Sequence, residues 1–197
     1  MTPRLALRLA LPLAAAGCAL LIPAPDPTRL YVLTTTIRAT ADASTDLVIG
    51  LGPVTVPQYL DRPEIMRRVE SNELEPSPTD RWAEPLDSQI ARTLGHDLTA
   101  LLRAQRVVPY PWYVRRDMAA IVEVDVLRFE TTAEGEALVV ARWRVRPVNG
   151  PGRTGLFTRT ERVPPDIHAQ IAALSRMVGA LAEEIAAVVR DAVPVKR

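Results

Sequence analysis

Alternating apolar and polar positions dominate the second half of the chain. In the segment 119–131, valines alternate with acidic residues as far as Val126, a two-residue period that predicts a strand with one buried face. At Leu127 the apolar positions change parity, and either a β-bulge or a second buried face accounts for this change. The segments 138–146 and 154–163 follow after glycine-containing turns, which predicts a three-stranded antiparallel meander.

The segment 138–146 separates its residues by chemistry between two faces. Trp143 shares one face with Val139, Ala141 and Val145, whereas three arginines occupy the other face. This separation predicts that the Trp143 ring is buried.

Shorter strand signals fill the first half of the chain. The segments 30–37 and 47–56 are rich in β-branched and other apolar residues, and 64–69 is a third segment of this kind. A loop containing proline and serine is expected from there through Asp80. A further short strand is expected over residues 107–110.

Two segments have the periodicity of amphipathic helices. The first begins at Pro85 and ends before Arg103. The second begins after Asp166, repeats apolar residues in alternating steps of four and three, and ends at Pro194. Its apolar seam fits either core packing or an intermolecular coiled coil, and we expect core packing. The sequence therefore predicts an α+β fold, a mostly antiparallel sheet with two amphipathic helices packed on it.

The N-terminal segment has the features of a secretory signal. Arg4 and Arg8 precede an uncharged run from Leu9 to Pro25. The alternative is a membrane-spanning helix, which needs about 20 apolar residues. Because this run contains three prolines and a glycine, we favour the signal peptide.

Small residues immediately precede the only cysteine. The sequence Ala15-Ala16-Gly17-Cys18 resembles a bacterial lipobox, which implies that the chain is cleaved before Cys18 and that Cys18 is diacylated. The three alanines at 14–16 leave open cleavage by an ordinary signal peptidase. Ala19 follows the cysteine in place of aspartate, which in Gram-negative lipoproteins implies sorting to the outer membrane. The expected organisation is a signal peptide at 1–17, a lipidated cysteine with a proline-rich tether at 18–29, and a folded domain at 30–193.

Composition narrows the class of protein. Hydrophobic residues make up 48% of the 197 residues and charged residues 24%, as in globular proteins. The net charge of +1 provides no field that would attract nucleic acid. One cysteine and two histidines cannot by themselves form a structural zinc site, and no disulfide is possible within the chain.

A search for catalytic motifs is largely negative. Gly50-Leu51-Gly52 superficially begins a dinucleotide-binding fingerprint, but a strand continues where that motif requires a helix. His96 lies beside Asp97 in the first predicted helix, where neighbouring side chains point about 100° apart, so we expect both on the surface. His168 has no partner that the sequence identifies. Catalysis is therefore the less favoured interpretation.

The most distinctive stretch of the chain runs from residue 52 to residue 86. It contains Gly52-Pro53-Val54 and Gln58-Tyr59-Leu60-Asp61-Arg62-Pro63, followed by Arg81-Trp82-Ala83-Glu84-Pro85. In order and spacing it resembles the PqiC family of ABC-type transport auxiliary lipoproteins. The likeness extends to residues 107–112, 128–130 and 141–143, although Met66-Arg67-Arg68 departs from the usual pattern.

The resemblance implies a non-enzymatic lipoprotein, without a cofactor, held in the outer membrane through lipidated Cys18. Its implied partner is the periplasmic MCE protein of an ABC-type or Pqi-type system that carries lipids between membranes, and the resemblance admits a homo-oligomeric ring. Two other classes stay open. One is a periplasmic envelope enzyme, and the other is an activator or assembly factor of a different envelope machine.

One short segment is the strongest candidate for binding that partner. Tyr59, Leu60, Asp61, Arg62 and Pro63 combine an aromatic ring, an acid and an arginine between two prolines, and Tyr and Arg are common at binding hot spots. Trp82 and Trp112 are further candidates. The alternative is a turn that stabilises the fold, with Asp61 paired to Arg62 or Arg81.

Overall fold

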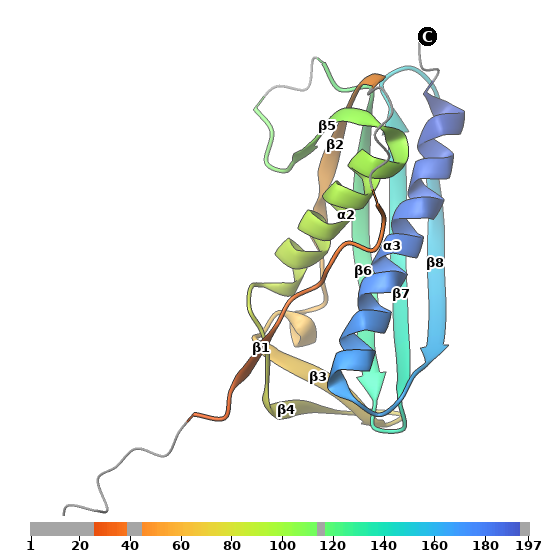
Figure 1. The fold of residues 1–197 in the computed structure, drawn as a ribbon. Helices are drawn as coiled ribbons and strands as arrows, with labels where there is room; N and C mark the ends of the chain where they lie inside the picture. Colours follow the sequence, from red (N-terminus) through yellow and green to blue (C-terminus); the bar gives the residue numbers. More distant parts are fainter. Residues whose placement is uncertain (1–25, 39–44, 114–116, 194–197) are drawn as a thin grey trace, which may run out of the picture.

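The computed structural model describes residues 26–38, 45–113 and 117–193 of the chain (Figure 1). Cys18, the expected signal peptide and Pro194 lie outside these residues.

The described chain forms two layers, a sheet of eight strands and a pair of helices that cover one of its faces (Figure 1). The elements are β1 (Arg29–Tyr31), β2 (Thr45–Thr55), the short 3-10 helix η2 (Gln58–Leu60), β3 (Glu64–Glu70), β4 (Glu73–Trp82), α2 (Leu86–Leu102), β5 (Ala104–Pro109), β6 (Ala120–Thr132), β7 (Glu136–Pro147), β8 (Arg153–Arg162) and α3 (Ile167–Ala192).

The predicted α+β class and the meander are confirmed. Strands β6, β7 and β8 pair in antiparallel order over the longest ladders of the sheet, and β3 pairs with β4 in the same way. Parallel pairing joins the remaining strands: β2 lies between β5 and β6, β3 also pairs with β6, and β1 pairs with β4.

Strand β6 joins the two halves of the sheet. One of its edges pairs with β7 along its length, whereas the other edge is shared by β2 near its beginning and by β3 at its end. The ladder with β7 shifts register between Val126 and Arg128, which confirms the β-bulge at Leu127. Because of this shift, Phe129 reaches the same core as Val126. A second, smaller apolar cluster lies on the other face of the sheet, around Ile121 near the start of β6.

Two sequence predictions for the first half need correction. Only residues 29–31 of the segment expected as strand 30–37 are in the sheet, because the chain then leaves it and donates its Leu33 amide to the Gln89 side chain. The expected loop before Asp80 is instead the strand β4. Its prolines are tolerated because β1 pairs only with residues 80–82, so Pro76 lies where β4 has one neighbour among the described strands.

The core lies between the helices and the sheet. The apolar seam of α3 is buried within the same molecule, which confirms core packing. Its most buried members are Leu174, Met177, Val178, Leu181 and Ile185. Asp166 begins α3 by accepting the Ala169 amide at 2.9 Å, a standard N-cap.

Trp143 is buried on β7, as its sequence neighbours predict, with 6% of its surface exposed. Its indole N–H donates to Glu184 Oε1 on α3 at 2.6 Å. Directly opposite on β8 is Gly155, where a Cβ atom would lie 2.2 Å from the indole ring. The ring therefore occupies space that only a glycine neighbour leaves open.

We expect Trp143→Ala to lower the free energy of unfolding by about 3–5 kcal/mol, because it removes a large buried ring. Glu184→Ala removes only the hydrogen-bond acceptor and should cost about 1 kcal/mol. Urea denaturation followed by circular dichroism measures both changes. Equal midpoints for Trp143→Ala and the unmodified chain would show that the ring contributes no packing.

Candidate functional site

The segment Tyr59–Pro63, called the docking loop here because its sequence nominates it for partner binding, lies in the connection from β2 to β3 and is held by hydrogen bonds of the local backbone. The Leu60 amide donates to the Pro57 carbonyl at 2.9 Å, and the Asp61 amide donates to the Gln58 carbonyl at 3.2 Å. These bonds form the turn of η2. A loop fixed in this way loses little further conformational entropy when it binds.

The first two residues of the docking loop point into the domain. Leu60 is 3% exposed and belongs to the core. Tyr59 is half-buried, and its hydroxyl donates to the carbonyl of the bulge residue Leu127 at 3.5 Å. Burial is the main cause that raises the pKa of Tyr59, and the negative charge of Glu130 adds to it. The hydroxyl therefore stays protonated and remains a donor.

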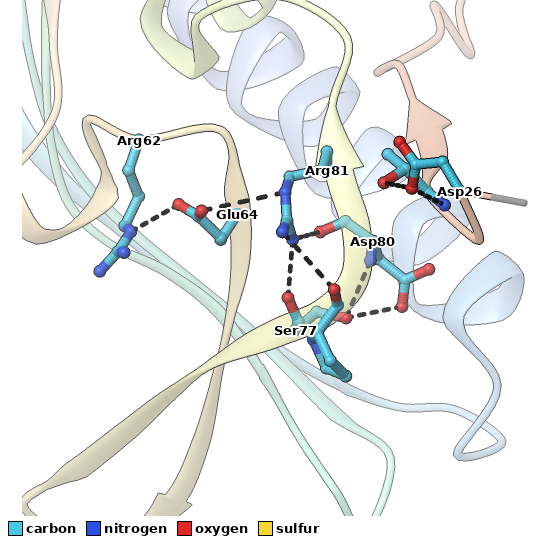
Figure 2. Close-up of polar contacts among 8 residues, drawn as sticks. Asp26, Arg62, Glu64, Ser77, Asp80 and Arg81 are labelled. Carbon is cyan, nitrogen blue, oxygen red and sulfur yellow. Dashed lines mark hydrogen bonds and ion pairs between the residues drawn. The ribbon is translucent and has the colours of Figure 1, made fainter. Parts of the chain in front are cut away.

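The last three residues, Asp61, Arg62 and Pro63, are exposed. Arg62 Nε donates to Glu64 Oε2 at 2.9 Å, and Arg81 Nε lies 3.9 Å from the other carboxylate oxygen of Glu64 (Figure 2). The hydrogen bond from Arg62 is the main cause that lowers the pKa of Glu64. Both arginines thus bind Glu64, which corrects the expectation that Asp61 pairs with one of them.

A polar network below the docking loop ties three strands together. Arg81 donates to the Ser77 carbonyl at 2.8 Å, and the Ser77 hydroxyl donates to Asp80 Oδ2 at 2.9 Å (Figure 2). Asp80 also accepts from Arg29 Nε on β1 at 2.9 Å. Because Asp80 and Ser77 are buried, this network fixes β1 to β4 close to the start of the described chain.

Trp82 is a core residue, with 6% of its surface exposed. Its ring packs against Phe129 with centroids 6.2 Å apart, and its backbone amide donates to the Pro63 carbonyl at 2.7 Å. The structure therefore places Trp82 beneath the docking loop as a support. Leu60 and Trp82 offer no open surface, and of the residues nominated on this segment the exposed ones are Asp61, Arg62 and Pro63.

Trp112 lies apart from the docking loop, beside the beginning of β6. Its half-buried indole donates to the Val108 carbonyl at 2.9 Å and packs edge-on against Tyr110 at 5.3 Å. Trp112 packs against the apolar cluster that contains Val48 and Ile121, whereas Tyr59 contacts Leu127 further along β6. Tyr113 beside it is 98% exposed. The structure thus divides the candidates between two places on the sheet.

The two glycines of the Gly50-Leu51-Gly52 motif leave room for Trp112 and Tyr110 against strand β2. A Cβ at Gly50 would lie 2.7 Å from the sulfur of Met118 and 3.1 Å from the Trp112 ring, and one at Gly52 would lie 2.8 Å from Tyr110 Cβ. The motif continues as strand β2, as expected. Its glycines are needed for close approach of side chains to the backbone.

A groove of about 430 Å³ lies between α2 and β5. Leu51, Ala91, Val107 and Tyr110 are among the residues that form its walls. His96 also lines it, in agreement with the expected exposure of this histidine. In the part of the chain that the structure describes, no cluster of histidine, cysteine and carboxylate residues is suited to a metal ion.

Asp97 corrects the sequence interpretation, because it is fully buried, whereas the side chain of its neighbour His96 points about 100° away around α2 and is exposed. It belongs to a polar stripe on α2, with Gln89 and Thr93 at intervals of four residues, and all three are at most 1% exposed. This stripe was not predicted from the sequence. Its signal was a run of polar residues at helical spacing beside the apolar seam.

A segment that leaves the sheet after β1 covers this polar stripe. Residues 33–37, here called the strap, cross the outer side of the helix pair (Figure 1). The Leu33 amide donates to Gln89 Oε1 at 2.7 Å, and the Thr34 amide donates to Ser175 Oγ on α3 at 3.2 Å. Thr35 donates its hydroxyl to Asp97. His168 has a partner in the same region, the ring of Tyr31 at 5.6 Å.

A buried ion cluster lies on the other face of the sheet. Glu130 on β6 has 2% of its side chain exposed and accepts two hydrogen bonds from Arg68, at 2.9 and 3.1 Å. Arg128 also donates to it. Arg68 falls in the triplet that departs from the family pattern, and the structure shows that the strand β3 is nevertheless formed there.

Together these features define a two-layer α+β domain with an ordered, partly exposed loop at the junction of its two half-sheets. Across residues 31–186, the chain matches the family model of the ABC-type transport auxiliary lipoprotein component. The chain belongs to this family. No helix among the described residues is long and apolar enough to cross a membrane.

Solved structures share the fold. One crystal structure of an uncharacterised protein has a TM-score of 0.69 at 18% identity, with 82% of this chain and 98% of that one covered. A protein from Xanthomonas campestris of the DUF330 family has a TM-score of 0.63 at 17% identity, with 80% and 92% covered. No curated protein matches the chain.

We expect Glu130→Ala to lower the free energy of unfolding by about 1–3 kcal/mol, because it removes the charge-assisted hydrogen bonds that the partly exposed Arg68 and Arg128 donate to a buried carboxylate. The matched control is Glu123→Ala, which removes a partly exposed carboxylate paired with Arg144 and Arg146 and should cost about 0–1 kcal/mol. Chemical denaturation measures both. Equal losses for the two variants would contradict a special role for the buried cluster.

Proposed function

We propose that this chain is a non-enzymatic outer-membrane lipoprotein that docks the periplasmic MCE protein of an ABC-type system carrying lipid between the membranes. The observation that carries this proposal is the family match over residues 31–186, which spans nearly all of the expected mature domain. The lipobox-like cysteine at position 18, just before that range, supports it independently.

The anchoring part of the proposal rests on Cys18. Two acyl chains hold a protein stably on a bilayer, whereas one chain holds it only marginally. The proline-rich tether expected over residues 18–29 has twelve residues and spans at most about 40–43 Å when fully extended. The domain therefore works close to the membrane surface.

The docking part of the proposal rests on the exposed end of the docking loop. Asp61, Arg62 and Pro63 are presented on a loop whose other end is fixed to the bulge by Tyr59. Such a rigid base lowers the entropic cost of binding. Trp112 remains a second candidate contact, because its neighbours Tyr110 and Tyr113 are exposed. We also propose a homo-oligomeric ring, which sedimentation of the detergent-extracted protein would measure.

Cys18→Ser should release a folded domain into the soluble periplasmic fraction, because the acyl chains are the only proposed anchor. The unmodified protein should remain with membranes after a high-salt wash, which removes proteins held by charge alone. Fractionation with immunoblotting measures the distribution. Retention of Cys18→Ser in the washed membranes would overturn the lipid anchor.

The docking loop is tested by capture of the purified MCE protein of the same system on the full-length chain. Asp61→Ala with Arg62→Ala should reduce capture at least tenfold and change thermal stability little, because both side chains are exposed and surface ion pairs contribute about 0–1 kcal/mol. Tyr59→Ala is a less clean variant, since it also removes a half-buried ring.

The matched control for the docking loop is Arg142→Ala. Arg142 forms an exposed ion pair with Asp125 at 3.5 Å on the open face of the sheet, comparable to the pair of Arg62 with Glu64. Arg142→Ala should leave capture unchanged. Undiminished capture by the Asp61 and Arg62 variant would reject docking through this loop, and no capture by the unmodified chain would reject the MCE partner.

A further inference from the structure

The two helices hold the strap through a set of residues called the seat here, Gln89 and Asp97 on α2 and Ser175 and Gly179 on α3. Its backbone amides at Leu33 and Thr34 bind side chains of α2 and α3, and the Thr35 hydroxyl binds Asp97. Leu33 is completely buried, whereas Thr34, Thr35 and Thr36 are exposed on their outer side. The helices therefore bind this segment through its backbone amides and through one buried apolar side chain, that of Leu33.

The shape of the seat depends on Gly179 of α3. A Cβ atom at this position would lie 2.4 Å from Thr36 Oγ1, although its contacts with Asp97 and Ile37, at 3.6 and 3.8 Å, would be ordinary. The helix itself has no need of a glycine here, and glycine inside a helix is less favourable than alanine. Gly179 thus makes room for the strap at the expense of α3.

The buried polar groups beneath the strap also depend on it. Gln89, Asp97 and Ser175 are each at most 1% exposed and contribute little to the apolar core. With the strap absent, the hydrogen bonds that these three side chains make to it would have to be made with water. In contrast, the apolar seams of α2 and α3 are packed against the sheet by many buried side chains, to which the strap contributes Leu33 alone. The helix layer can therefore persist when the strap leaves.

We propose that the strap, residues 33–37, acts as a releasable latch. It opens from the helix pair while the rest of the domain stays folded, and protonation of Asp97 favours the closed state. Segments held by few buried contacts open at lower free energy than the core that supports them. The proposal concerns this chain alone and is independent of the partner proposed above.

The environment of Asp97 gives the direction of the pH effect. Burial is the main cause that raises its pKa, opposed by the hydrogen bonds from Thr35 and from the Ile37 backbone. The charged groups that act on it from the packed helices are His96, which lowers the pKa, and Glu183, which raises it. One carboxylate oxygen of Asp97 has no hydrogen-bond partner among the described residues. An ionised carboxylate is therefore poorly accommodated in the closed latch.

The sign follows from linkage. When the latch opens, Asp97 gains water and its pKa falls toward the ordinary value, so the closed state binds the proton more tightly. The extra stability of the closed latch is fully present below the open-state pKa and is lost as pH rises through the closed-state pKa. Acidification strengthens the latch, and alkalinisation loosens it.

Hydrogen–deuterium exchange of the full-length protein in detergent tests the seat directly. Gly179→Ala should speed exchange in residues 33–37 about tenfold and leave strand β7 protected, because the new methyl group displaces Thr36. Thr36→Ala alone should change little. The double variant should restore protection, since the clashing oxygen is gone. Unchanged exchange in Gly179→Ala, or no rescue in the double variant, would overturn the latch.

The second experiment measures the same protection from pH 4, near the ordinary pKa of an aspartate, up to pH 8, corrected for intrinsic exchange rates. Protection of residues 33–37 in the unmodified chain should fall as pH rises, whereas Asp97→Asn should show a flat profile. Thr154→Val on the exposed side of β8 is the control and should follow the unmodified chain. A pH profile that Asp97→Asn leaves intact would reject the role of Asp97, and exchange of the strap only together with β7 would reject separate opening.

Discussion

The register shift at Leu127 is the constraint on which the rest of the structure depends. A strand as long as β6 twists along its length, and a change of parity within it would normally turn its apolar residues toward solvent. The bulge reverses that change, so that Val126 and Phe129 contact one continuous core. At the same place, β2 leaves the edge of β6 and β3 takes its position. The docking loop lies where the chain crosses between these two strands. The Tyr59 hydroxyl donates to the carbonyl of Leu127 in the bulge.

Much of this architecture follows from local sequence patterns. The meander and both helices could be predicted because their periodicities of two residues and of 3.6 residues are long and regular. Strand β4 could not, because Pro76 and Pro78 are typical of loops and are accommodated only by the one-sided pairing of that part of the strand. The strap could not either, since its threonines and branched residues fit a strand equally well. Its position on the helices is determined by the polar stripe of α2, whose contacts with it are 56 and 62 residues away in the sequence.

The candidate site shows the same division between local and tertiary information. Exposure of Asp61, Arg62 and Pro63 agrees with their position in a polar turn between strands. The partner of Arg62, Glu64, lies only two residues away in the sequence, but the second arginine on Glu64 is Arg81, which β4 brings from another part of the chain and which local sequence does not identify. Burial of Asp80, Asp97 and Glu130 follows a related rule. Each of these carboxylates links segments that are distant in sequence, and a buried charge with a dedicated partner disfavours alternative pairings.

The order of the elements at the N-terminal end bears on how far the domain extends from its anchor. Strand β1 is three residues long and pairs only with β4 among the described strands, and the strap follows it directly. Fifteen residues, 30–44, therefore lie between the tether expected at 18–29 and the start of β2 at Thr45. Fully extended, a stretch of this length spans about 50–54 Å, more than the twelve-residue tether itself. Under the proposed anchoring, a domain that releases β1 and the strap more than doubles its reach from the membrane, and the distance at which it meets the proposed partner is set by how much of this end is folded.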